Sequence, residues 1–429
     1  MHDFKYKGNS LYCESIRVED LSKKVATPFY LYSYKTLIDH FRKLKKAFRS
    51  INPLICYSMK ANSNLAICSS LVKEGAGLDI VSGGELFKAT KSGVSPKKIV
   101  YASVGKTQKE IQQALKIGIL FFNVESEAEL ENINRVARNL KKDAKVAIRI
   151  NPDVEPKTHQ YITTGRLTNK FGIDFRTAKN IFLKRKEFRN LKINGLHIHI
   201  GSQIIKSAPF VSAIKRVANF VAELKKELID LEFLNIGGGL GIIYKDEKPQ
   251  TADEFAKAVL PILKQTGLKI ILEPGRFIAG NAGILVAKVL YIKKTKAKTF
   301  VIVDAGMNDL IRPALYSAYH EILPIEHRAF PRLRSGQASI EHRKKVDIVG
   351  PICESADFFA KDRLLPRINE GDLLAIMGAG AYGFSMSSNY NCRSRVAEVM
   401  VIKNKFFITR KRETYNDLIR GETIPSILK

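Results

Sequence analysis

Short apolar runs alternate with amphipathic stretches over residues 30–275 of the chain. Stretches such as 35–50, 126–140 and 212–230 carry apolar residues at helical spacing, whereas the continuous runs between them are typical of strands covered on both faces. The predicted strands are Leu54–Ser58, Leu78–Val81, Ile99–Ala102, Leu120–Val124, Val146–Ile150, Gly195–Ile200, Phe233–Ile236 and Ile270–Leu272. Strands and helices alternating in this way predict a (β/α)8 TIM-type barrel.

A doubly wound open sheet would alternate in the same way, but no GxGxxG motif follows the first strand, which favours the barrel. After about residue 282 the pattern changes to strand-like segments separated by turn residues. These are Ile284–Lys293, Thr299–Val303, Val346–Val349, Leu373–Met377, Arg395–Ile402 and Lys405–Thr409. We therefore expect a barrel domain at 30–280, and a β-sandwich or β-barrel-like domain formed by 1–29 and 281–429.

Composition places the chain among ordinary globular proteins, with 45% apolar and 26% charged residues. The five cysteines form no CxxC pair, which argues against a zinc site or a disulfide framework and indicates a reducing compartment. No apolar run approaches the ~18–20 residues of a membrane span, and the first residues lack an apolar signal core. We expect a soluble, cytoplasmic protein without a metal site and without a membrane partner.

The formal net charge of +29 is compatible with two interpretations. A basic surface can bind nucleic acid or attract anionic metabolites, and lysines can also merely solvate a surface. The lysines are spread along the chain and no nucleic-acid motif accompanies them, so we expect no nucleic-acid partner. The basic, unpatterned segment 329–345 is predicted to be an exposed loop or insertion.

Chemically distinctive residues follow several of the predicted barrel strands. Active sites of β/α barrels form at the C-terminal ends of the strands, where these side chains would meet. The residues are Lys60, Asp79, the pair His197 and His199, Ser202, the triplet Gly237–Gly239, and the run Glu273, Pro274, Gly275 and Arg276. Their common position predicts an active site at this end of the barrel.

Each of these residues has an ordinary structural explanation when taken singly: a surface lysine, a core histidine, a turn. Together they fit one cofactor. A lysine at the close of a buried strand suits Schiff-base chemistry, and bare glycine amides can bind a phosphate. The imidazole of His199 could stack on a planar ring. A carboxylate at Glu273, facing a pyridine nitrogen, would favour the pyridinium that makes decarboxylation possible.

Four motifs resemble pyridoxal-phosphate (PLP) decarboxylases of the alanine-racemase-like group: YSMKAN at 57–62, HIHIGSQI at 197–204, NIGGGLG at 235–241 and EPGR at 273–276. Three more resemble the diaminopimelate decarboxylase family in particular. They are MNDLIRPALY at 307–316, GPICESAD at 350–357 and GAGAYGFSMSSNYN at 378–391. The resemblance covers nearly the whole chain. It departs in Ser394, where the family usually has proline, and in the length of the basic segment 329–345.

The resemblance implies decarboxylation of meso-diaminopimelate to L-lysine, the last step of lysine biosynthesis, through an aldimine on Lys60 and a quinonoid intermediate. It implies a homodimer in which Cys353 reaches across the interface as proton donor. The expected catalytic residues are Lys60, His199, Glu273 and Cys353. The expected cofactor contacts are Lys60, Asp79, His199, Ser202, Gly238, Gly239, Glu273, Pro274, Gly275, Arg276 and Tyr382. The expected substrate contacts are Arg276, Arg312, Tyr316, Glu354 and Tyr382.

The cofactor motifs set the chemistry but not the substrate, because carboxynorspermidine, ornithine and arginine decarboxylases share them. Diaminopimelate keeps a distal amino-acid end, so its site needs a cation for the carboxylate and an anion for the ammonium. Arg276 and Arg312 are the candidate cations, and Glu354 is the candidate anion. An ornithine-type substrate has no distal carboxylate and no need of Arg312.

Overall fold

The computed structural model describes residues 2–155, 170–326 and 344–428. Most of the predicted basic loop at 329–345 therefore lies outside the described residues. The chain divides into two compact units: a barrel unit, Leu37–Ala279, and a β unit formed by Met1–Thr36 with Gly280–Lys429.

The barrel unit contains a closed barrel of parallel strands in the order β10-β11-β12-β5-β6-β7-β8-β9. Each strand is short and almost entirely buried, as its apolar sequence predicts. The strands are β5 (Leu54–Ser58), β6 (Gly77–Ile80), β7 (Ile99–Tyr101), β8 (Phe121–Val124), β9 (Ala144–Arg149), β10 (Leu191–His197), β11 (Phe233–Asn235) and β12 (Lys269–Leu272). The predicted (β/α)8 barrel is confirmed.

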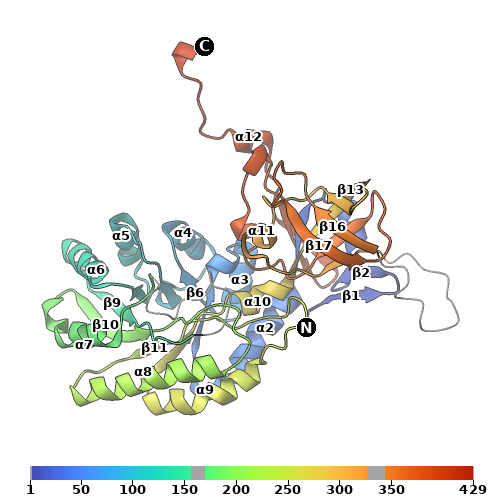
Figure 1. Ribbon diagram of the computed structural model, residues 1–429. Helices are drawn as coiled ribbons and strands as arrows, with labels where there is room; N and C mark the ends of the chain where they lie inside the picture. Colours follow the sequence, from blue (N-terminus) through green and yellow to red (C-terminus); the bar gives the residue numbers. More distant parts are fainter. Residues whose placement is uncertain (1, 156–169, 327–343, 429) are drawn as a thin grey trace. The chain divides into compact units, whose positions relative to one another are not determined.

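Helices alternate with these strands and surround the barrel (Figure 1). Several begin with a serine, threonine, asparagine or aspartate that caps the first turn, and α5 and α9 carry complete capping boxes. The helices are α2 (Tyr34–Ala47), α3 (Leu65–Lys73), α4 (Gly83–Lys91), α5 (Gln108–Ile117), α6 (Glu127–Asn139), α7 (Phe175–Leu183), α8 (Ala208–Lys226), α9 (Ala252–Thr266) and α10 (Arg276–Ala279).

The interior of the barrel is filled by side chains from several strands that contact one another. They form one buried cluster: Cys56, Val100, Phe121, Ala147, Phe233 and Ile271, with Leu54 and Leu120 packed against it. Because side chains alternate along a strand, the residue two positions after a member of this cluster also points inward, nearer the C-terminal end.

The β unit contains two sheets. The smaller is antiparallel and consists of β1 (Phe4–Lys7), β2 (Ser10–Cys13) and β3 (Ile16–Arg17). The larger runs β17-β16-β14-β13-β4-β19-β20, with β18 paired to β13 and β15. Its strands are β4 (Phe29–Ser33), β13 (Gly283–Lys294), β14 (Thr299–Val303), β15 (Ile322–Pro324), β16 (Lys344–Val349), β17 (Phe358–Leu365), β18 (Leu373–Ile376), β19 (Ala397–Ile402) and β20 (Lys405–Arg410). The predicted second, all-β domain is confirmed.

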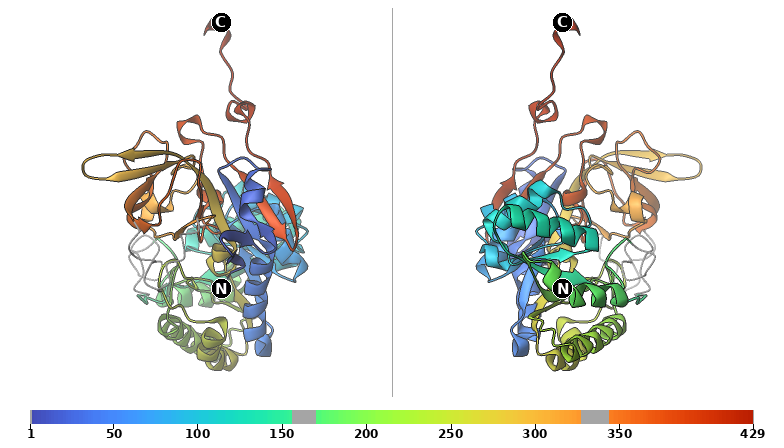
Figure 2. Two further views of the ribbon diagram at one scale, coloured as in Figure 1. Left: turned by 90° about the vertical axis from the view of Figure 1, so that its right-hand side faces the viewer. Right: turned by 90° about the vertical axis from the view of Figure 1, so that its left-hand side faces the viewer.

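The short helices of the β unit are α1 (Val18–Ser22), α11 (Arg312–Tyr316) and α12 (Tyr415–Leu418). The segment after β20 runs away from the sheets of its unit in both side views (Figure 2). Among the described residues, no helix has both the length and the apolarity required to cross a membrane.

The division between the units differs from the predicted boundary near residue 30. That boundary falls inside β4, which pairs with β13 and β19 and therefore belongs to the β unit. Strand β17 had no counterpart among the predicted strands. Its centre carries Lys361 and Asp362, and Asp362 has a φ of 51°, so the apolar pattern is interrupted where the strand bulges.

Candidate active site

A layer of buried polar side chains lies at the C-terminal ends of the barrel strands, directly above the apolar cluster. Its members stand two residues after inward-pointing positions on the same strands. They are Ser58, Asp79, Asn123, Arg149, His197, Asn235 and Glu273. Burying polar groups is costly unless they bond to one another, and this layer is densely bonded.

Glu273 is the centre of this layer, and three side chains from three strands contact its carboxylate. Asn123 Nδ2 and Asn235 Nδ2 donate to Oε1 at 3.1 and 2.5 Å, and His197 Nε2 lies 3.2 Å from Oε2. Burial by itself would raise the pKa of Glu273. The nearby His197, Lys60 and Asn235 outweigh it and hold the pKa below its usual value. Glu273 is therefore an ionised carboxylate inside the barrel.

Asp79 is a second buried carboxyl group in the layer, and unlike Glu273 it is protonated. Ser58 Oγ donates to its Oδ2 at 2.6 Å, and Lys60 Nζ lies 3.8 Å from the same oxygen. Burial, and then the charge of Glu273, raise the pKa of Asp79 to about 8. The two carboxyls thus differ in the way expected when one low-dielectric site holds a single negative charge.

Lys60 lies at the mouth of the barrel, in the turn that directly follows β5. Its side chain is 38% exposed, which leaves the amine accessible to a small molecule. The predicted neighbours Lys60, Asp79 and Glu273 are brought together by the closure of the barrel between β12, β5 and β6.

His199 lies just after β10, which ends at His197 and not near Ile200 as predicted. The amide of Gly238 donates to His199 Nδ1 at 3.2 Å, so this nitrogen is the unprotonated one. Burial, together with the charges of Lys60 and Arg149, lowers the pKa of His199 well below its usual value. His199 is consequently a neutral, half-buried imidazole.

The three glycines after β11 lie so close to neighbouring backbone that no larger residue would fit. A Cβ atom on Gly238 would lie 2.1 Å from the carbonyl oxygen of Glu273, and one on Gly239 would lie 2.3 Å from that of Gly201. The loops after β10, β11 and β12 therefore pack backbone against backbone, which only glycine permits.

The segment after β12 completes this side of the mouth. The carbonyl of Pro274 accepts from the amide of Ser58 at 3.1 Å, and a Cβ atom on Gly275 would touch Ala61 and Ser58. Arg276 is buried, and its Nη1 donates to the hydroxyl of Tyr244 at 2.6 Å. Ser202 is half-buried in the loop after β10. Tyr244 was not predicted, because it lies in an irregular loop without a motif.

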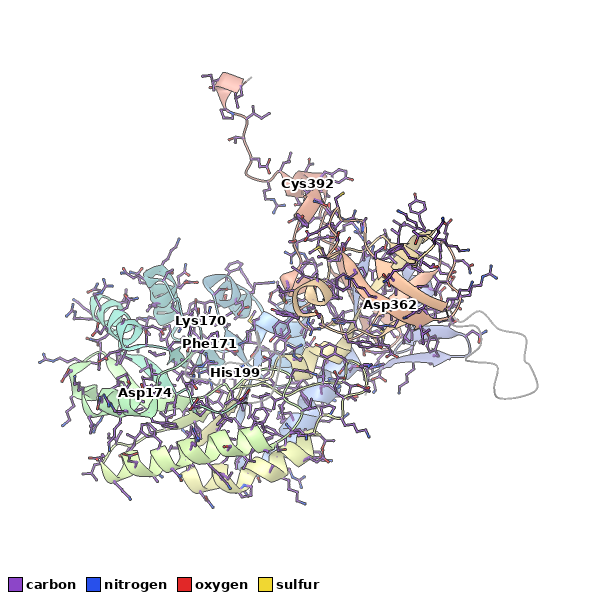
Figure 3. The ribbon with its side chains drawn as sticks, viewed as in Figure 1. Lys170, Phe171, Asp174, His199, Asp362 and Cys392 are labelled. Atoms are coloured by element: carbon purple, nitrogen blue, oxygen red, sulfur yellow. The ribbon has the colours of Figure 1, made fainter. Side chains whose placement is uncertain are left out.

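A second ion pair supports the loop that carries His199. Arg149 Nη1 donates to Glu125 Oε1 at 2.5 Å, and its Nη2 lies 3.4 Å from the carbonyl oxygen of His199. The guanidinium also stands 4.8 Å from the ring centre of Phe171. Figure 3 shows Phe171 and His199 in the same part of the barrel unit. Sequence reasoning missed Asn123, Arg149 and Asn235, although each follows an inward-pointing apolar residue by two positions.

The predicted substrate residues Arg312 and Tyr316 belong to the β unit, on the short helix α11. Arg312 is buried, and its Nη1 lies 2.8 Å from His320 Nε2. Tyr316 is half-buried at the end of the same helix.

Cys353 and Glu354 are exposed on a loop of the β unit. Asp357 shapes this loop, since its carboxylate accepts from the amides of Ile352 and Met307, both at 2.6 Å. The segment that contains Cys392, which Figure 3 labels, is hydrogen-bonded to this loop. There the amide of Cys353 donates to Asn391 Oδ1 at 3.3 Å, and the hydroxyl of Tyr390 donates to Glu354 at 3.0 Å.

Tyr382 has a φ of 56°, a conformation that tyrosine seldom adopts. Such strain is often found at functional sites. The neighbouring Gly383 is needed because a Cβ atom there would lie 2.4 Å from the carbonyl oxygen of Ala379. Across the described ranges, no cluster of three or more His, Cys, Asp or Glu side chains has the geometry of a metal site.

The barrel residues fit a pyridoxal phosphate. An accessible amine at Lys60 can bond to its aldehyde, and the buried carboxylate of Glu273 can stabilise a positive charge on its ring. The buried Oδ1 of Asp79 has no hydrogen-bond partner among the described residues, so this atom can still take part in a polar contact. The glycine loops and Arg276 offer donors of the kind that bind phosphate.

Comparisons with known proteins agree that the cofactor is pyridoxal phosphate. Residues 34–280 match the family described as pyridoxal-dependent decarboxylase, pyridoxal binding domain. The diaminopimelate decarboxylase of Aquifex aeolicus (strain VF5) is 46% identical over 418 residues, 97% of this chain and 96% of the relative.

Two solved structures are similar over nearly the whole chain. The diaminopimelate decarboxylase of Helicobacter pylori complexed with L-lysine is 43% identical with a TM-score of 0.88, covering 94% of this chain and 99% of that chain. The M. jannaschii diaminopimelate decarboxylase in co-complex with L-lysine is 39% identical with a TM-score of 0.92, covering 99% of each chain. The predicted cofactor, pyridoxal phosphate, and the predicted class, a PLP-dependent carboxy-lyase, are confirmed. The chain belongs to the diaminopimelate decarboxylase family of pyridoxal-dependent decarboxylases.

Proposed function

We propose that this chain decarboxylates meso-diaminopimelate to L-lysine and carbon dioxide, in the last step of lysine biosynthesis. The observation that carries the proposal is the polar layer of the barrel, in which Glu273 is held as an anion by Asn123, His197 and Asn235 beside the amine of Lys60. The relatives named diaminopimelate decarboxylase, and two similar structures that contain L-lysine, support the choice of substrate.

When bound, pyridoxal phosphate supplies the electron sink that allows a carboxylate to leave from the α-carbon. Lys60 would hold the cofactor covalently. Glu273, being ionised, stabilises a positive charge opposite it, and His199, being neutral, offers a flat imidazole face. Ser202, Gly239, Gly275 and Arg276 would bind the phosphate, together with Gly238 and Pro274 of the same loops.

The substrate contacts follow from charge. The distal carboxylate of diaminopimelate requires a cation, which Arg312 provides with Arg276, and the distal ammonium requires an anion, which Glu354 provides. Tyr316 and Tyr382 complete these contacts. We infer that Cys353, whose thiol is exposed on a loop, protonates the α-carbon after carbon dioxide has left.

We infer that the active form is a homodimer in which Cys353 and Glu354 serve the site of the partner subunit. Their exposure on a loop held by Asp357 and Asn391 supports this arrangement. We also infer a cytoplasmic location, which agrees with the absence of any disulfide among the five cysteines.

Substitution of Lys60 tests the proposed function. The Lys60→Ala protein should lack the visible absorption of the lysine-bound cofactor and should release no carbon dioxide from meso-diaminopimelate above background. Lys98→Ala is a matched control, because Lys98 precedes β7 at the opposite end of the barrel. Full activity of Lys60→Ala would contradict the proposal. A wild-type protein that prefers ornithine, arginine or carboxynorspermidine would contradict the choice of substrate.

A further inference from the structure

A histidine that the proposed mechanism does not use is buried against Arg312 in the β unit. His320 is fully buried and Arg312 is nearly so. Arg312 Nη1 lies 2.8 Å from His320 Nε2, and His320 Nδ1 lies 2.8 Å from the carbonyl oxygen of Met377. Both ring nitrogens are thus within hydrogen-bond distance of a protein partner.

The two partners determine where the proton of His320 resides. A carbonyl oxygen only accepts, so Nδ1 must carry the hydrogen that points at Met377. A guanidinium only donates, so Nε2 must present its lone pair to Arg312. The imidazole is therefore neutral and held in one tautomer, because protonation of Nε2 would turn an attractive contact with Arg312 into a repulsive one.

The backbone around His320 is fixed from two sides. Arg363 Nη1 donates to the carbonyl of His320 at 2.9 Å, and its guanidinium stands 4.0 Å from the ring centre of Tyr319. On the other side, the amide of Met377 donates to the carbonyl of Glu321 at 2.8 Å, and β15 pairs with β18 from Ile322 onward. The backbone that carries the imidazole is therefore held in place beside Arg312.

We propose that His320 is a positioning residue that orients Arg312 toward the distal carboxylate of the substrate and so sets the selectivity for amino acids over diamines. This inference rests on the proposed function. A long arginine side chain loses rotamer freedom on binding, and a partner that fixes Nη1 beforehand reduces that cost.

A neutral partner also preserves the charge of Arg312. An aspartate or glutamate at position 320 could hold the guanidinium equally well, but its negative charge would compete with the incoming carboxylate. A neutral imidazole fixes the orientation and leaves the positive charge for the ligand. This explains a buried histidine, in place of an acid, beside a buried arginine.

Three variants of His320 separate its two contacts. In His320→Gln the amide oxygen falls near the position of Nε2 and can still accept from Arg312. In His320→Asn the shorter amide can still donate to Met377 but does not reach Arg312. His320→Leu makes neither contact. Tyr6→Phe is the matched control, because Tyr6 also donates to a backbone carbonyl, that of Pro324, in the same unit.

The product provides a sharp probe of carboxylate recognition. L-lysine retains the distal carboxylate of meso-diaminopimelate, whereas cadaverine has the same chain without it. The experiment measures kcat and KM for meso-diaminopimelate and the inhibition constants of L-lysine and cadaverine, all with the cofactor-loaded enzyme. Isothermal titration of L-lysine gives its affinity without turnover, and the melting temperature of each variant reports folding.

We expect His320→Leu and His320→Asn to raise KM and the L-lysine inhibition constant by about tenfold or more, with kcat changed by less than about threefold. Inhibition by cadaverine should stay unchanged. His320→Gln should remain within about threefold of wild type in all constants, and so should Tyr6→Phe. If His320→Leu does not fold, the comparison of the Asn and Gln variants decides.

The inference is overturned if the Leu and Asn variants keep wild-type KM and L-lysine affinity, or if L-lysine and cadaverine weaken equally. It is also overturned if Gln behaves like Leu, because the acceptor for Arg312 would then be irrelevant. These results leave the proposed function intact when the wild type releases carbon dioxide from meso-diaminopimelate. A wild type that neither decarboxylates that substrate nor binds L-lysine overturns both.

Discussion

Two buried carboxyl groups, on the two strands that flank β5 in the barrel, are kept in different charge states by their surroundings. Glu273 accepts from Asn123 and Asn235, has His197 Nε2 at 3.2 Å, and stays ionised. Asp79 is bonded mainly to the hydroxyl of Ser58 and takes up a proton. The site thereby holds one negative charge at a defined place, opposite which a cationic ring can be stabilised.

The raised pKa of Asp79 predicts a pH-dependent stability of the cofactor-free protein. The folded state binds the proton of Asp79 up to about pH 8, but the unfolded chain loses it near 3.8, so this group destabilises the fold increasingly as pH rises between these values. Asp79→Asn stays neutral throughout. We expect its melting temperature to match wild type near pH 4 and to exceed it by roughly 5 °C at pH 8.

Scanning calorimetry of both proteins across this pH range makes the measurement. Asp253→Asn, which changes an exposed carboxyl on α9, serves as control and should give the same difference from wild type at every pH. A constant offset between Asp79→Asn and wild type from pH 4 to 8 would show that Asp79 is already ionised in the folded protein.

At the scale of elements, the loops after β10, β11 and β12 are held together by glycine backbones. In Gly238→Ala the new methyl group would lie 2.1 Å from the carbonyl oxygen of Glu273, so one loop must shift. Because that shift moves Glu273 relative to Lys60, we expect affinity for pyridoxal phosphate to fall by more than about tenfold, with a lower melting temperature.

Gly84→Ala is the matched control for this prediction. Gly84 lies in α4, and the nearest atom to a Cβ there is 3.8 Å away. Alanine in a helix is favoured over glycine by ~0.5–1 kcal/mol, so this variant should be slightly more stable and should bind the cofactor normally. Equal cofactor affinities for the two alanine variants would show that loop packing does not position the site.

The elements that the sequence predicts well are those whose signal is local. Every barrel strand appeared as a buried apolar run, and Lys60 and Glu273 could be placed at strand ends from that pattern. The partners of Glu273 could not be found in this way. Asn123, His197 and Asn235 contact one carboxylate only because the barrel closes in this register. In the sequence they lie 150, 76 and 38 positions before Glu273.

The apolar pattern also gave wrong predictions where charged residues interrupt a strand, or where a strand pairs with strands that are distant in the sequence. β17 contains Lys361 and Asp362 at its bulge and was not predicted. β4 precedes the barrel in sequence but pairs with β13 and β19, so the boundary was placed a few residues too early. The tautomer of His320 likewise follows only from the atoms that surround it in space.

At the scale of the whole molecule, the proposed chemistry divides its residues between the two units of the chain. Lys60 and Glu273 belong to the barrel unit, and Cys353, Glu354 and Arg312 to the β unit. In the proposed homodimer, the Lys60 of one subunit works with the Cys353 of the other, so neither chain would be active without a partner.

Mixed dimers test this arrangement directly. Lys60→Ala should be inactive, and Cys353→Ala should bind cofactor but form product at least about 100-fold more slowly. When the two variants are unfolded together and refolded as a mixture, half of the dimers contain one chain of each kind. In such a dimer, one site combines an intact Lys60 with an intact Cys353, so activity should recover to about 25% of wild type. If Lys60 and Cys353 of the same chain formed the site, every site in the mixture would carry one substitution, and no recovery would occur.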